Sequence, residues 1–96
     1  MLFVLTCIDK ENSLDTRKAA RDAHIAYVRD TGVVRLGGPF LDANGDMAGS
    51  LLILDMADLD AVKAWQQNDP YVKAGLFATS EVQPWKSTFN PVDIKF

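Results

Sequence analysis

The order of apolar runs and helical patterns in this 96-residue chain predicts an α+β fold. Two segments with helical spacing are interleaved with four β-forming runs, in the order strand, helix, strand, strand, helix, strand. The two middle strands flank an Asn44-Gly45 step, which is the strongest short-range signal for a β-hairpin. This is the ferredoxin-like βαββαβ order, in which an antiparallel sheet carries its helices on one face.

The first predicted strand covers residues 2–8, a continuous run of apolar and β-forming residues typical of a strand buried on both faces. Cys7 lies in this run and is assigned to the core, because apolar surroundings make a thiol a poor nucleophile. A helix is then expected from the N-cap residue Ser13 to about Asp30, ending at Gly32.

The hairpin is predicted to comprise a strand over residues 33–40, a loop through Asp46 and a strand over residues 48–56. We expect this hairpin at the centre of the sheet. Its glycine-rich end is predicted to form one wall of a pocket, because glycine lets backbone or a ligand come close. The same glycines would also suit a bulge and a turn. This end contains Gly37, Gly38, Pro39, Gly49 and Ser50.

A second helix is expected to begin near Asp58 and to carry apolar residues, including Trp65 as a core residue, at helical spacing. It ends before Pro70, because proline forces the preceding residue out of the helical region. Residues 71–76 are expected to form a short helical turn, and residues 77–85 the last strand.

Composition and charge narrow the classes of function. The chain is 48% hydrophobic with a net charge of −3, which suits one globular domain over residues 1–96 and lacks the basic excess of a nucleic-acid-binding surface. Neither a transmembrane run nor a signal peptide is recognisable, and one cysteine allows no internal disulfide. These features predict a cytoplasmic protein that binds neither nucleic acid nor membrane.

The first helix carries basic residues in the middle of its apolar face. At about 100° per residue, Arg17, Arg21, His24 and Val28 fall within about 60° of one another. In one interpretation the arginines extend to the rim and His24 bonds to a backbone carbonyl. In the other, the row lines a pocket with a titratable base and cationic walls, where unpaired cations need an anion, unless Arg21 pairs with Asp69 or another carboxylate.

Asp69 has two possible roles. It can act as a turn or cap residue, or as an acid aimed at the pocket, in which case it comes within hydrogen-bond reach of His24, directly or through one water. Pro70 fixes the chain just after Asp69 and would hold its carboxylate. No second histidine, Cys-x-x-Cys pair, phosphate loop or dinucleotide fingerprint accompanies these residues, so neither a metal site nor a cofactor is expected. A hydrolytic triad built on Ser50 is not favoured.

Five motifs occur in a characteristic order: Arg17-x-x-x-Arg21-x-x-His24, Gly38-Pro39, Gly49-Ser50, Asn68-Asp69-Pro70-Tyr71-x-x-Ala74-Gly75-Leu76 and Val82-x-Pro84-Trp85. In this order and spacing the chain resembles the YciI-like, or YCII-related, family over nearly its whole length. The resemblance implies a ferredoxin-like fold that dimerises through its sheets as a dimeric α+β barrel. It also implies a pocket in which His24 and Asp69 match a candidate catalytic pair, and elimination or isomerisation chemistry on small, often aromatic, metabolites.

Two classes of function follow. The first is a small cofactor-independent enzyme of lyase or isomerase type, in which His24 acts as general acid and base, Asp69 sets its tautomer, and the substrate is a small anionic or aromatic metabolite. A cofactor-free oxygenase is a variant of this class. The second is a non-catalytic binding or regulatory module for a small acidic metabolite. The residues expected to bind the ligand are Arg17, Arg21, Gly38, Pro39, Ser50 and Tyr71.

A homodimer is expected because the third strand is apolar on both faces. Leu52 and Leu54 point one way, and Leu51 and Ile53 the other. The helices can cover only one face, so a second copy is the simplest cover for the other. Residues 87–96 form a C-terminal tail whose apolar side chains are suited to docking on the partner subunit.

Overall fold

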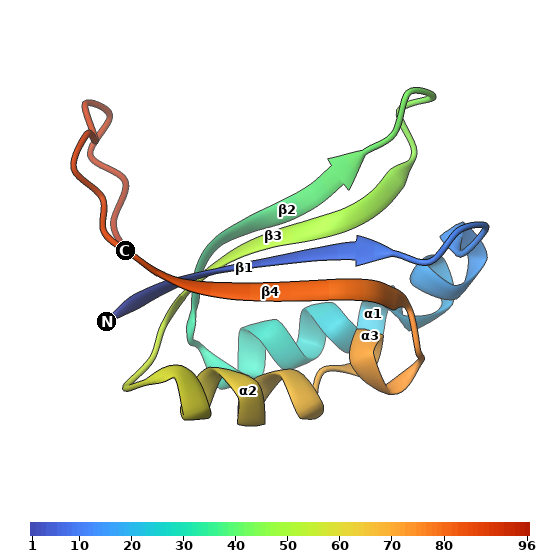
Figure 1. Ribbon diagram of the computed structural model, residues 1–96, viewed down its shortest axis with the longest axis horizontal. Coiled ribbons are helices and arrows are strands. Elements are labelled where there is room, and N and C mark those ends of the chain that lie inside the picture. Colours follow the sequence, from blue (N-terminus) through green and yellow to red (C-terminus); the bar gives the residue numbers. More distant parts are fainter.

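The computed structural model describes all 96 residues, Met1–Phe96. A four-stranded antiparallel sheet carries three helices on one face (Figure 1). The strands lie in the order β2-β3-β1-β4, which confirms the ferredoxin-like α+β fold. No helix is long and apolar enough to cross a membrane. The elements are β1 (Leu2–Asp9), α1 (Leu14–Thr31), β2 (Val34–Leu41), β3 (Met47–Asp55), α2 (Leu59–Gln67), α3 (Pro70–Lys73) and β4 (Phe77–Trp85).

The position of the hairpin differs from the prediction. β3 is central, but β2 is an edge strand with β3 as its only neighbour, because β1 pairs with the other side of β3. The expectation that the whole hairpin forms the sheet centre is therefore wrong for its first arm. An edge position suits Pro39, which has no N–H to give to a second neighbour.

The hairpin loop has the turn chemistry that its sequence predicts. The side chain of Asp42 accepts hydrogen bonds from the backbone N–H groups of Asn44 at 2.8 Å and Asp46 at 3.1 Å. Gly45 follows with a φ of +80°, a conformation that favours glycine. The loop is thus fixed by local contacts alone.

The ends of the two longer helices are formed in different ways. Ser13 occupies the N-cap position of α1 as predicted, but its hydroxyl donates to the carbonyl of Glu11 and caps no helical N–H. Gly32 ends α1 in the left-handed conformation, with a φ of +67°. At α2 the predicted cap is confirmed, because the side chain of Asp58 accepts from the N–H of Ala61 at 2.8 Å.

The core lies between the sheet and the helices. Alternate residues of β1 are buried there, and Leu5 pairs in register with Leu52 of β3. Cys7 is 2% exposed, and burial raises the pKa of its thiol, as expected for a core cysteine. The other residues of β1 are half-buried or exposed, so within one chain this strand is buried on one face only, contrary to the prediction.

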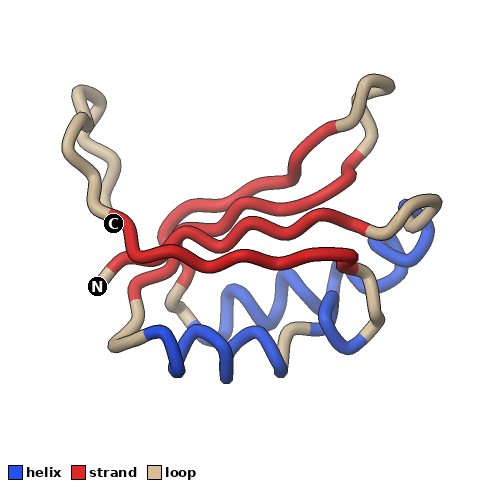
Figure 2. Tube along the Cα trace, viewed as in Figure 1, coloured by secondary structure: helices blue, strands red, loops and turns tan.

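The opposite face of the sheet carries no helix. Figure 2 shows all three helices on one side, while the hairpin tip and the C-terminal tail rise on the other. The uncovered face bears a cavity of about 280 Å³, and four of its five lining residues are hydrophobic. This cavity is lined by Val4, Leu51, Ile53, Gln83 and Trp85.

We expect Gly49→Ala to lower the free energy of unfolding by about 1–3 kcal/mol, the usual effect of overpacking. An added Cβ at Gly49 would lie 2.5 Å from the backbone oxygen of Cys7 on β1, and backbone cannot easily yield. The matched control is Gly38→Ala in the same hairpin, where a Cβ meets nothing within 4 Å and the effect should stay within about 0.5 kcal/mol. Urea denaturation measures both changes, and equal losses would contradict the steric argument.

Candidate active site

A cleft of about 280 Å³ lies between α1 and the β2–β3 side of the sheet, with α3 contributing one residue. This volume suits a small molecule. Seven of the eight residues singled out from the sequence line the cleft, and the eighth, Asp69, is buried in contact with His24. The predicted lining residues are Arg17, Arg21, His24, Gly38, Pro39, Ser50 and Tyr71. Of the two other glycines of the glycine-rich end, Gly37 lines the cleft and Gly49 does not. The cleft adds Ile25, Val28, Val34, Met47 and Leu52.

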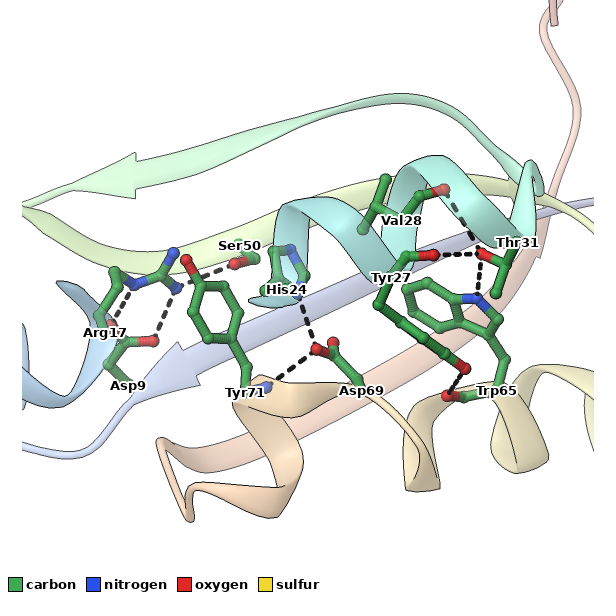
Figure 3. Close-up of polar contacts among 10 residues, drawn as sticks. All are labelled: Asp9, Arg17, His24, Tyr27, Val28, Thr31, Ser50, Trp65, Asp69 and Tyr71. Carbon is green, nitrogen blue, oxygen red and sulfur yellow. Dashed lines mark hydrogen bonds and ion pairs between the residues drawn. The ribbon is translucent and has the colours of Figure 1, made fainter. Parts of the chain in front are cut away.

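The predicted contact between His24 and Asp69 is present in the structure. Nδ1 of His24 lies 2.7 Å from Oδ1 of Asp69, and the two residues are 8% and 2% exposed. A carboxylate only accepts hydrogen bonds, so Nδ1 carries the proton and Nε2 of a neutral imidazole is left as an acceptor. Figure 3 shows the second ring nitrogen on the side of the imidazole that faces away from Asp69.

Asp69 is held by the start of α3. Its Oδ1 also accepts the backbone N–H of Tyr71 at 3.0 Å, so Asp69 is the N-cap of this short helix. Pro70 occupies the first turn, where its fixed φ suits a helix and its missing N–H costs nothing. The two roles considered for Asp69, cap and acid in contact with the pocket histidine, are therefore combined in one carboxylate.

Tyr71 packs against the imidazole. Its ring stacks on His24 with the centroids 3.9 Å apart and the planes 15° from parallel. Burial raises the pKa of the Tyr71 phenol, and the charges of Arg17 and Arg21 oppose this effect without cancelling it. The phenol is therefore protonated at neutral pH and can donate a hydrogen bond into the cleft.

Arg17 is bound by a carboxylate that the sequence analysis missed. Its Nε and Nη2 donate to the two oxygens of Asp9 at 2.7 and 2.9 Å, and Nη2 also donates to Oγ of Ser50 at 2.9 Å (Figure 3). Burial opposes the charge of Arg17, but the hydrogen bonds and charge of Asp9 prevail, so the pKa of Arg17 is raised. The carbon Cζ lies 4.7 Å from the centroid of the Tyr71 ring.

This pairing corrects the expectation that Arg17 is an unpaired cation that needs an anion from outside the chain. The side chains of Arg17 and Asp9 are only 3% and 4% exposed, and each neutralises the other. One signal in the sequence could have revealed this partner. Asp9 directly follows the apolar run of the first strand, and the helix that comes next carries Arg17 on its apolar face. Arg21, in contrast, is exposed at the rim of the cleft and forms no ion pair.

A second polar network fixes the far end of α1 to α2. The hydroxyl of Tyr27 donates to the carbonyl of Trp65 at 2.7 Å, and the indole N–H of Trp65 donates to Thr31 at 2.9 Å (Figure 3). Trp65 is 5% exposed and belongs to the core, as predicted. None of these three residues lines the cleft, so the network positions α1 without touching a ligand.

No group of three or more His, Cys, Asp or Glu side chains that could hold a metal ion is present. The two pairs of the site each combine one basic side chain with one carboxylate, His24 with Asp69 and Arg17 with Asp9. Such a set can move a proton at Nε2 and hold a negatively charged oxygen beside the guanidinium.

We expect Asp9→Asn to lower the free energy of unfolding by about 3–5 kcal/mol, because it leaves the buried charge of Arg17 without its partner. The matched control is Asp55→Asn, since Asp55 is 40% exposed and its pairing with the N-terminal ammonium is screened by water. Chemical denaturation of both variants tests the difference. A loss no larger than that of the control would show that Asp9 is not the essential partner of Arg17.

Comparison with known proteins connects this site to a family. The family model of the YCII-related domain matches residues 1–86. Protein YciI of Escherichia coli O6:H1 is 37% identical over 98 residues, covering 93% of this chain and 100% of that protein. An uncharacterized protein of Haemophilus influenzae is 32% identical with the same coverage.

Two solved structures are similar to this chain in fold, and one of them is also similar in sequence. A 5-chloro-2-hydroxyhydroquinone dehydrochlorinase (TftG) from Burkholderia phenoliruptrix AC1100, in complex with 2,5-dihydroxybenzoquinone, is 39% identical with a TM-score of 0.84, covering 90% of this chain and 94% of that one. An antibiotic biosynthesis monooxygenase is 14% identical with a TM-score of 0.58, covering 92% and 99% of the two chains, and shows the fold alone. The motifs, the matched domain and the relatives agree: this chain belongs to the YCII-related family.

Proposed function

We propose that this protein is a small enzyme that uses His24 and Asp69 as an acid–base pair on a small hydroxylated aromatic metabolite, in elimination or isomerisation chemistry. The observation that carries the proposal is the buried 2.7 Å contact between the two residues at the wall of a cleft. An imidazole whose Nδ1–H is fixed by a carboxylate presents Nε2 as a base of defined orientation.

The substrate class is supported by two findings. The dehydrochlorinase that is 39% identical acts on a chlorinated hydroxyhydroquinone and was solved with a dihydroxyquinone. The cleft of this chain combines polar groups with an apolar wall that includes Ile25, Val28 and Leu52, which suits a flat ring bearing hydroxyl groups.

The proposed reaction on a ring that carries a leaving group proceeds in two proton transfers. In the first, Nε2 of His24 takes the proton of a ring hydroxyl and returns it to the ring carbon that bears the leaving group, which gives the keto tautomer. In the second, Nε2 takes the proton of another hydroxyl, the oxygen electrons form a carbonyl, and the leaving group departs with its bonding pair. The sum is loss of HX and formation of a quinone, with His24 passing the last proton to solvent.

The charged oxygen formed in each step needs stabilisation. The hydroxyl of Ser50 lies at the cleft wall and accepts a hydrogen bond from Nη2 of Arg17 at 2.9 Å, so its own proton is available for donation to that oxygen. Asp69 stabilises the imidazolium that forms while the proton is on His24. Asp9 keeps the guanidinium in place, so that Nη2 holds Ser50 in a fixed position.

We expect wild-type protein to release chloride from a chlorinated hydroxyhydroquinone, and His24→Ala and Asp69→Asn to lower kcat by about 10²- to 10⁴-fold, the usual contribution of general acid–base catalysis. Chloride release and quinone absorbance measure the rate. The matched control is Asp22→Asn, an exposed carboxylate of α1 that does not line the cleft, and its rate should equal that of the wild type.

The same experiment separates the enzyme from a non-catalytic binding module. A wild-type protein that binds 2,5-dihydroxybenzoquinone in calorimetry but turns over no substrate of a panel of hydroxylated rings would favour the binding module. Turnover that survives in His24→Ala would assign the proton transfer to another residue.

We also propose that the protein is a homodimer packed through the uncovered face of the sheet. This face is apolar and hollowed, and Leu51 and Ile53 lie on it in the central strand. The C-terminal tail rises on the same side and exposes Phe89 by 86% and Val92 by 75%, so it is placed to dock on the second subunit.

We expect light scattering to give twice the 10.6 kDa chain mass at micromolar concentration. Leu51→Glu should convert the dimer to a monomer, because it places a charge in the apolar face. The matched control is Leu59→Glu on α2, which is 39% exposed on the helical side and should stay dimeric. A wild-type monomer, or a Leu51→Glu protein that stays dimeric, would exclude this interface.

A further inference from the structure

The charges that line the cleft do not balance. Arg17 is neutralised by Asp9, and His24 is paired with Asp69. Arg21 also lines the cleft, yet it has no carboxylate within 4.0 Å and no side-chain hydrogen bond. The cleft therefore carries an excess positive charge that no group of the chain uses for its own stability.

The position of Arg21 on α1 places this charge beside the proposed chemistry. Arg21 lies one turn after Arg17, a rise along the helix axis of about 6 Å, and three residues before His24, a rise of about 4.5 Å. All three side chains line the same cleft. The charge of Arg21 also lowers the pKa of the Tyr71 phenol, although burial outweighs it, so the guanidinium acts on the interior of the cleft.

The three basic residues differ in how firmly they are held. Arg17 and His24 are buried and fixed by short hydrogen bonds, which suits groups that must meet reacting atoms. Arg21 is exposed and its long side chain is free to adjust, which suits a group that recognises a part of the ligand remote from the reaction. A guanidinium binds a carboxylate through two parallel hydrogen bonds, a geometry that favours planar anions.

We infer that Arg21 is a specificity-determining residue that pairs with a carboxylate on the substrate ring, so that hydroxylated aromatic acids are bound more tightly than neutral phenols, which remain substrates. This inference rests on the proposed function of the same cleft. The reacting hydroxyl then lies at Nε2 of His24, the ring lies against the apolar wall, and the carboxylate lies at the rim beside Arg21.

Such a contact has a defined signature. It is present in the ground state and in the transition state alike, so its loss raises KM and leaves kcat nearly unchanged. Because Arg21 is exposed to water, its contribution to affinity is reduced by solvent and falls further with added salt.

The test compares two probes of nearly the same shape, the anion 2,5-dihydroxybenzoate and the neutral 2,5-dihydroxybenzamide, by isothermal titration calorimetry. We expect wild-type protein to bind the carboxylate about 3- to 5-fold more tightly at low salt, and Arg21→Gln to lose this preference while its Kd for the amide changes less than about twofold. Arg21→Lys should keep part of the preference. The matched control is Arg29→Gln, an exposed arginine of the last turn of α1 outside the cleft, which should behave as the wild type.

Each outcome decides the assignment. A carboxylate preference that persists in Arg21→Gln, an equal loss in Arg29→Gln, or the absence of any preference or binding in the wild type would overturn it. Because binding is read without turnover, a preference that depends on Arg21 in a protein without lyase activity would sustain the ligand class and reject only the reaction. Elimination on neutral rings that is unaffected by Arg21→Gln would sustain the reaction and reject only the ligand class.

Discussion

The buried ion pair between Arg17 and Asp9 is the interaction on which the candidate site depends. An arginine on the inner face of α1 would be strongly destabilising without a partner, because removing a charge from water costs several kcal/mol. Asp9 stands at the end of β1, so the bidentate contact joins the end of the strand to the first turns of the helix. With its charge neutralised, Arg17 is free to orient Ser50 and to lie over Tyr71 without destabilising the fold.

Local signals in the sequence predict most of the fold, and long-range pairing accounts for the rest. The hairpin loop, the stop at Gly32 and the cap at Asp58 were predictable because each depends on neighbours within a few residues. The edge position of β2 was not, since strand order depends on β1 pairing with β3 across about forty to fifty residues. The missing cap at Ser13 has a local cause that the residue type does not reveal, since the hydroxyl turns to the carbonyl of Glu11 instead.

The candidate site likewise has one part that patterns in the sequence predict and one part that depends on the folded structure. Helical spacing places Arg17 and His24 on one face, and the Asp-Pro step indicates a fixed carboxylate. The contact of His24 with Asp69 could be predicted because the predicted topology also sets the first helix beside the end of the second. The role of Arg17 could not, because which acid meets a buried arginine depends on the distance between β1 and α1 in the folded chain. The consequence is chemical: Asp9 neutralises Arg17, so Arg17 supplies a fixed donor, and the free charge of the cleft belongs to Arg21.

The strand β3 links the cleft to the proposed dimer interface. Its successive side chains alternate between the two faces of the sheet, so Ser50 and Leu52 line the cleft while Leu51 and Ile53 lie on the uncovered face. A shift of one residue in the pairing of β3 would exchange the two sets and remove both surfaces at once. Gly49 opposes such a shift, because its backbone approaches Cys7 of β1 where any other residue would collide. The register of one central strand therefore determines both where a ligand binds and where a second subunit would pack.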